Sequence, residues 1–155
     1  MQDQGFEISA DAIARGLANV KANTWLKGRW QVLNEQPLTI ADTGHNKDGL
    51  KQVFTQLEKV RTGKLYIVLG MMADKDFEAI KNLFPTDALY LTCSPNTPRA
   101  LPANQLTEKL LANNLEAITI GTVSDAYEKV KELATPSDTI FIGGSTFVVA
   151  EIPDL

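Results

Sequence analysis

The amino-acid sequence predicts an α/β fold: a mostly parallel six-stranded sheet with one antiparallel strand and helices on both faces. From residue 46 onward, strand-like runs alternate with amphipathic helical patterns, which is typical of right-handed crossovers in a parallel sheet. The run Lys64–Gly70 is almost continuously apolar, as expected of a strand buried on both faces. Two earlier runs flank the turn-prone segment Asn34–Pro37, and we expect them to form a hairpin that supplies the antiparallel strand.

The first elements follow from local patterns. Apolar residues recur at helical spacing over Ile8–Val20, which predicts a short opening helix. The two strands of the hairpin are Arg29–Asn34 and Pro37–Asp42. A second helical pattern begins at Asn46 and ends near Gly63, which we interpret as a C-cap glycine.

The rest of the chain repeats one strand–helix unit. After Lys64–Gly70 the sequence predicts a short helix over 77–84, a strand over 87–92, a helix over 102–114, a strand over 117–120, a helix over 123–134 and a strand over 138–142. Neither an inter-domain linker nor a low-complexity segment is evident from the sequence, so we expect these elements to form one domain.

Composition and charge exclude several classes of protein. The chain has 155 residues, 44% of them hydrophobic and 22% charged, which is typical of a globular domain. The formal net charge is -4, with dispersed Lys and Arg, so neither nucleic acid nor a membrane surface is an expected partner. A single cysteine, which cannot form a disulfide within the chain, favours a reducing cytoplasm. No apolar segment is long enough to be expected to span a bilayer. The N-terminal residues lack the pattern of a signal peptide, and we expect the chain to be a fragment.

The main candidate site lies in the run Leu38–Asn46. An apolar strand stops at Asp42, and the one histidine of the chain, His45, lies in the turn before the next helix. Ligands of α/β proteins bind at the carboxyl ends of parallel strands, so this corner is a candidate site. An imidazole at a helix N-terminus can bind an anion. The same residues also fit an ordinary capping aspartate beside a surface histidine.

Two further polar segments come directly after predicted strands. Asp74–Asp76 fits a charged turn that caps the next helix as well as part of a site. Gly143–Ser145 exposes successive backbone N–H groups, a geometry that binds anions, although glycines there also permit a tight turn.

Other motifs support no site of their own. The sequence contains no phosphate loop, no Gly-x-Gly-x-x-Gly and no nucleophile-elbow serine, so a self-contained nucleotide site and a Ser-His-Asp triad are not expected. We interpret Trp25 and Trp30 as packing anchors, and Cys93 as a buried or half-buried side chain. One cysteine and one histidine do not make a zinc site, and we assign no metal ligand to this chain.

Five motifs occur together and in order, and they resemble the C-terminal domain of folylpolyglutamate synthase/dihydrofolate synthase, a family of the Mur ligase superfamily. The motifs are Gly28–Gln31, Asp42–Asn46, Gly70–Asp76, Pro98–Leu101 and Gly143–Ser145. The resemblance extends from about Ile8 to Ile152. Two positions depart from the family pattern, since Lys47 and Lys27 stand where proline is common.

The resemblance implies a Rossmann-like Mur ligase C-terminal domain fold over residues 25–155, with 1–24 as a helix and connection from an N-terminal ATPase domain. It implies part of an ATP-dependent ligase that joins L-glutamate to dihydropteroate or a folate through an acyl phosphate. ATP and Mg²⁺ would be bound mainly by the N-terminal domain of the same polypeptide. We therefore expect the fragment alone to be inactive.

The resemblance also implies roles for individual residues. Arg29 would reach the ATP phosphates and Asp42 the nucleotide ribose. His45 and Ser145 would hold the incoming glutamate, so that Arg29 and His45 take part in catalysis. Possible contacts at the rim of the site are Asn46, Asp74, Lys75 and Asp76.

Two alternatives stay open. Mur peptidoglycan ligases, which add other amino acids, share this domain and a similar Asp-x-x-His-Asn corner. A stand-alone α/β module that binds an amino acid or a protein also fits the scaffold, and Trp25 would then serve an interface. A response-regulator receiver is disfavoured, because the spacing of its acidic residues does not fit the first strands.

Overall fold

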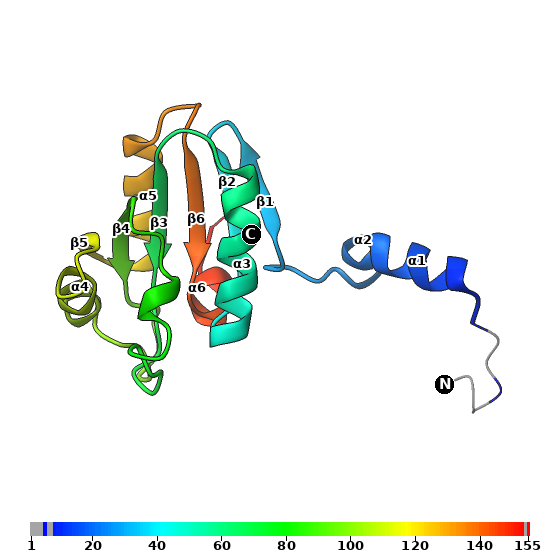
Figure 1. Cartoon of the computed structure of the whole chain (residues 1–155), viewed down its shortest axis with the longest axis horizontal. Helices are drawn as coiled ribbons and strands as arrows, with labels where there is room; N and C mark the ends of the chain where they lie inside the picture. Colours follow the sequence, from blue (N-terminus) through cyan, green and yellow to red (C-terminus); the bar gives the residue numbers. More distant parts are fainter. Residues whose placement is uncertain (1–4, 6–7, 154) are drawn as a thin grey trace.

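A computed structural model gives the fold of the chain and describes residues 5, 8–153 and 155. Its sheet has six strands in the order β1-β2-β6-β3-β4-β5 (Figure 1). Only β1 is antiparallel to its neighbour, as the sequence predicts. The strands are β1 (Gln31–Glu35), β2 (Leu38–Asp42), β3 (Leu65–Leu69), β4 (Ala88–Cys93), β5 (Glu116–Gly121) and β6 (Thr139–Gly143).

Helices cover both faces of the sheet, which confirms the predicted layers (Figure 1). The α3 helix (Lys47–Val60) and α4 (Ala103–Leu111) pack on one face, and α5 (Val123–Leu133) and α6 (Thr146–Ala150) pack on the other. Strand β3 shows why both faces are apolar. Leu65, Ile67 and Leu69 belong to the core under α3 and α4. Tyr66 and Val68 belong to the core under α5 and α6, because successive side chains of a strand point to opposite faces.

The helix starts are set by short polar residues. Side-chain oxygens of four N-cap residues accept hydrogen bonds from backbone N–H groups of the first turn, which would otherwise lack a partner. These residues are Ser9 for α1 (Ala10–Ala18), Asn46 for α3, Thr122 for α5 and Ser145 for α6.

The N-terminal helices α1 and α2 (Val20–Thr24) project away from the sheet (Figure 1). Every side chain of α1 is exposed. Trp25, in the connection to β1, has 84% of its surface exposed, so its interpretation as a packing anchor is wrong within this chain. Trp30 is partly buried against the core under α3, which confirms its packing role. The first residues of the chain, including 1–4 and 6–7, lie outside the described residues.

Two local predictions were wrong. The segment 77–84 forms turns and one 3-10 helix, η2 (Lys81–Leu83), in place of an amphipathic α-helix. Phe84 precedes Pro85 and is extended, because proline disfavours the helical conformation of the residue before it. Gly63 is not the C-cap of α3, which is Arg61. Gly63 has φ +57, and a Cβ there would collide with the carbonyl oxygen of Ser137.

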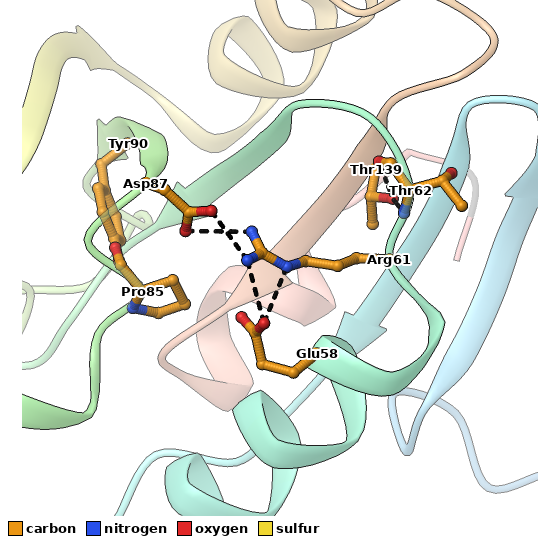
Figure 2. A network of polar contacts seen from close by, with 7 residues as sticks. All are labelled: Glu58, Arg61, Thr62, Pro85, Asp87, Tyr90 and Thr139. Atoms are coloured by element: carbon orange, nitrogen blue, oxygen red, sulfur yellow. Dashed lines mark hydrogen bonds and ion pairs between the residues drawn. The ribbon is translucent and has the colours of Figure 1, made fainter.

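A bidentate ion pair joins two elements at the amino end of the parallel strands. Nη1 and Nη2 of Arg61 donate to the two carboxylate oxygens of Asp87 at 3.1 and 2.8 Å, and Nε donates to Glu58 at 3.0 Å (Figure 2). The guanidinium holds the pKa of the Asp87 carboxyl below its usual value. The ion pair thereby joins the end of α3 to the start of β4, at the opposite end of the strands from the candidate site.

No helix among the described residues is long and apolar enough to cross a membrane.

Candidate ligand-binding site at the carboxyl end of the sheet

A hollow of about 160 Å³ lies where the carboxyl ends of neighbouring strands meet. Its lining comes from the segments that follow β2, β3, β4 and β6. The lining residues are His45, Met72, Lys75, Arg99, Gly144, Ser145, Thr146 and Phe147. The structure therefore brings together three residues that the sequence singles out, namely His45, Lys75 and Ser145.

The end of β2 is organised by Asp42, a buried carboxylate. One of its oxygens accepts a hydrogen bond from the backbone N–H of Gly44 at 2.7 Å, and the other accepts from the N–H of Trp30 at 2.7 Å. Asp42 thus fixes the loop that carries His45 and the connection that carries Arg29. It does not line the hollow.

His45 is partly buried in the wall of the hollow. Its Nδ1 lies 3.0 Å from the carbonyl oxygen of Thr43. When Nδ1 carries the proton it donates to this carbonyl, and Nε2 is then the ring nitrogen that can accept a hydrogen bond. The neighbouring Asn46 caps α3 by accepting from the N–H of Gly49 at 2.8 Å.

Two loops are joined beside the hollow by a short backbone ladder. The N–H of Ala73 donates to the carbonyl of Arg99 at 2.9 Å, and the N–H of Leu101 donates to that of Met71 at 2.8 Å. Met72 and Ala100 form an antiparallel bridge between these bonds. The ladder places Arg99, from the loop after β4, in the same hollow as Lys75 from the loop after β3.

The two acidic residues of the loop after β3, Asp74 and Asp76, have different partners. Asp74 forms an ion pair with Arg99, with 3.2 Å between its Oδ2 and Nη2. Asp76 accepts a hydrogen bond from the N–H of Ala79 at 3.3 Å. Asp76 therefore caps the turn that follows it, which agrees with the plainer of the two interpretations of this segment.

Glycines shape the end of β6. Gly144 has φ +90, and a Cβ there would lie 2.6 Å from the carbonyl oxygen of Gly70, so only glycine fits. Ser145 follows, 3% exposed, and its Oγ accepts from the N–H of Phe147 at 3.2 Å. Because that bond uses the oxygen as an acceptor, the hydroxyl proton can be donated to a ligand.

The structure separates the other predicted residues from the lining. Arg29 is exposed in the connection before β1, and neither Arg29 nor the residues Asn46, Asp74 and Asp76 line the hollow. The sequence interpretation gave no individual role to five lining residues, namely Met72, Arg99, Gly144, Thr146 and Phe147, although Gly144 lies in the segment Gly143–Ser145 that it offered for anion binding. Arg99 had a usable signal, because it belongs to the motif Pro98–Leu101.

The lining has the character of a site for a small anion with an apolar part. Lys75 and Arg99 supply positive charge, and Ser145 supplies a hydroxyl donor. Met72 and Phe147 add apolar surface. Within the described ranges, His, Cys, Asp and Glu do not gather in groups of three or more that could hold a metal ion.

Comparison with protein families gives one match. A family model described as "Mur ligase, glutamate ligase domain" matches residues 28–146. This range contains every residue that lines the hollow except Phe147, which follows it directly, and it excludes α1 and α2.

Known proteins match the chain over nearly its whole length. A probable bifunctional folylpolyglutamate synthase/dihydropteroate synthase of Haloferax volcanii is 34% identical over 146 residues, which is 94% of this chain and 17% of the relative. E. coli FolC, solved with DHPP and ADP, has a TM-score of 0.80 at 27% identity. A bifunctional folylpolyglutamate synthase/dihydrofolate synthase with Mn, AMPPNP and L-glutamate bound has a TM-score of 0.80 at 31% identity. Each solved structure is matched over 94% of this chain and 34% of its own.

Proposed function

The chain belongs to the Mur ligase family of glutamate ligase domains, and from this premise we propose that it is the C-terminal domain of an ATP-dependent ligase that joins L-glutamate to dihydropteroate or a folate. The observation that carries the proposal is the hollow at the carboxyl end of the sheet, with His45, Lys75, Arg99 and Ser145 in its wall. A solved relative named for this activity was crystallised with L-glutamate. The chain spans 17% to 38% of the length of its curated relatives, so the activity belongs to a longer polypeptide, here called the parent ligase.

In the proposed reaction the acceptor carboxylate is first converted by ATP into an acyl phosphate. The amine of glutamate attacks the acyl carbon, the new C–N bond forms, the C–O bond to phosphate breaks, and the amine loses a proton. This domain holds the glutamate so that its amine faces the acyl carbon, which removes much of the entropic cost of bringing two substrates together.

The hollow fits this task by charge and size. Glutamate carries two carboxylates, and Lys75 and Arg99 provide two cations in one wall. His45 and Ser145 lie in the same wall and would orient the amino acid by hydrogen bonds. A space of about 160 Å³ suits an amino acid better than a nucleotide.

Arg29 and Asp42 would act toward the nucleotide. Arg29 is exposed on the connection, where it can reach phosphates bound by another domain, and a planar cation there stabilises charge that develops during phosphoryl transfer. Asp42 would add a contact to the ribose while it keeps its two backbone hydrogen bonds, because each carboxylate oxygen accepts more than one.

We assign ATP and Mg²⁺ mainly to an N-terminal ATPase domain of the parent ligase. Solved relatives carry ADP or AMPPNP, two of them with Mn, which supports nucleotide and divalent metal use by the family. Residues 1–24 would connect the two domains, and α1, whose side chains are all exposed, would pack on the preceding domain. The isolated chain would then have no acyl phosphate to consume.

The test is a glutamate ligation assay on the parent ligase with dihydropteroate, tetrahydrofolate and a muramyl peptide as parallel acceptors. We expect ATP-dependent ligation to a pterin acceptor that is lost in His45→Ala with the fold intact. Ligation confined to the muramyl peptide would show a peptidoglycan ligase. Turnover of ATP by residues 1–155 alone would contradict the proposal that the N-terminal domain binds ATP and that the isolated chain is inactive.

A further inference from the structure

Two arginines of this domain use their guanidinium groups differently. Arg61 at the amino end of the strands binds two carboxylates through three nitrogens, and its side chain is mostly buried (Figure 2). Among the described residues, the side chain of Arg99 in the hollow has one hydrogen-bond partner, from Nη2 to Asp74 at 3.2 Å, and it is 62% exposed. Most of the donors of Arg99 therefore remain available to a ligand.

The partner of Arg99 lies beside the hollow and does not line it. The backbone ladder between Ala73 and Arg99 fixes the loop of Asp74 against the loop of Arg99, so the two charges stay within reach of each other. The carboxylate of Asp74 is thus already paired with the guanidinium of Arg99, which lines the hollow. An incoming carboxylate meets the same cation and is repelled by the charge of Asp74.

We propose that Asp74 is the resident counter-ion of Arg99 and that a carboxylate of the incoming amino acid takes its place. The proposal rests on the proposed function of the hollow. Exposed ion pairs are weak, so the exchange is easy, yet the charge of Asp74 lowers the affinity of the hollow for every anion. A ligand with a second carboxylate that pairs with Lys75 regains this lost affinity. The hollow therefore favours amino acids with two carboxylates over ligands with one.

The test compares variants of the parent ligase by their KM for L-glutamate and their kcat. We expect Asp74→Asn to lower KM about two- to five-fold with kcat unchanged, the range that corresponds to one exposed ion pair. Asp74→Glu keeps the carboxylate and should keep the KM of the wild type. Loss of folded enzyme would lower the apparent kcat, and distortion of the site would raise KM. A lower KM with kcat unchanged therefore separates loss of a competing charge from a structural defect.

A matched control is available four residues along the chain. Glu78 also forms an exposed ion pair, with Lys81, but neither residue lines the hollow. Glu78→Gln removes the same charge and should leave KM unchanged. A KM for Asp74→Asn that equals or exceeds the wild-type value overturns the inference alone. Absence of glutamate-dependent turnover in the wild type overturns the proposed function.

Discussion

The carboxylate of Asp42 accepts a hydrogen bond from the backbone N–H of Trp30 at 2.7 Å, across the hairpin from the end of β2 to the start of β1. Its other oxygen accepts from Gly44 at 2.7 Å. One side chain therefore fixes both the connection that carries Arg29 and the loop that carries His45. Trp30 itself has φ +44, a conformation that bulky residues rarely adopt, so the bond stabilises a strained position.

We expect Asp42→Ala to lower the free energy of unfolding by about 2 kcal/mol or more, because it leaves two backbone N–H groups without their acceptor. Urea denaturation followed by tryptophan fluorescence measures the change. Asp48→Ala removes an exposed carboxylate in the first turn of α3 and should lower the free energy of unfolding by well under about 1 kcal/mol. Equal effects of the two substitutions would show that the buried hydrogen bonds contribute little.

Ser145→Ala should lower kcat/KM of the parent ligase on the order of 100-fold, because Ser145 both caps α6 and lines the hollow that we propose for glutamate. Loss of the cap alone costs about 1 kcal/mol of stability. Thr122→Ala removes an equivalent cap from α5, outside the hollow, and should cost similar stability with normal activity. Similar activity in the two variants would reduce Ser145 to a structural role.

The pair of Arg61 and Asp87 should make stability depend on pH (Figure 2). The folded state lowers the pKa of Asp87, so its contribution is present above the usual carboxyl pKa, about 3.9, and is lost as pH falls through the lowered value. Asp87 is largely exposed and screened, so Asp87→Asn should cost no more than about 1 kcal/mol at pH 7.

Urea titrations of wild type and Asp87→Asn at pH 7 and near pH 2 test this dependence. The two curves should converge in acid. Asp11→Asn breaks an exposed pair with Arg15 and serves as the control, with no measurable change expected at either pH. A difference between wild type and Asp87→Asn that persists in acid would mean that packing, not charge, is responsible.

Removing residues 1–24 should change the free energy of unfolding of the chain by less than about 0.5 kcal/mol, because α1 buries no side chain. Equilibrium urea denaturation of the shortened and full chains measures the difference. A clear loss of stability would show that the N-terminal helices pack on the sheet domain. In the parent ligase, by contrast, we expect the same segment to be protected from proteolysis.

Burial, with the negative charge of Glu151 as a smaller cause, raises the pKa of the Cys93 thiol to about 12. Because the thiolate is the reactive form, we expect a disulfide reagent at pH 8 to react far more slowly with the folded chain than with the chain in urea. Comparable rates in the two conditions would show that β4 opens readily in the native state.

The succession of strands and helices along the chain and the helix layers on both faces were largely predictable, because apolar periodicity is strong in the buried elements. The run Lys64–Gly70 became β3, and α3 begins directly after its cap residue Asn46, as predicted. The segment 77–84 was not predictable from spacing, since its apolar side chains reach the core from turns as well as they would from a helix.

The site was predictable at its strand ends and less so elsewhere. His45 and Ser145 directly follow strands that meet in the sheet, so their convergence follows from topology. Arg99 comes six residues after β4 and reaches the hollow through a backbone ladder between loops, which no periodicity encodes. Trp25 illustrates the opposite error, because an aromatic residue gives no local signal of whether its packing partner lies within the same domain.

Strand β6 comes last among the strands in sequence but lies between β2 and β3 in space. During synthesis on the ribosome, the sheet therefore consists of two parts that share no strand pairing, the β1-β2 hairpin and the strands β3, β4 and β5, until residues Thr139–Gly143 are added. Both parts then expose apolar edges that β6 alone can join, which places the folding of the whole domain after translation of its final strand.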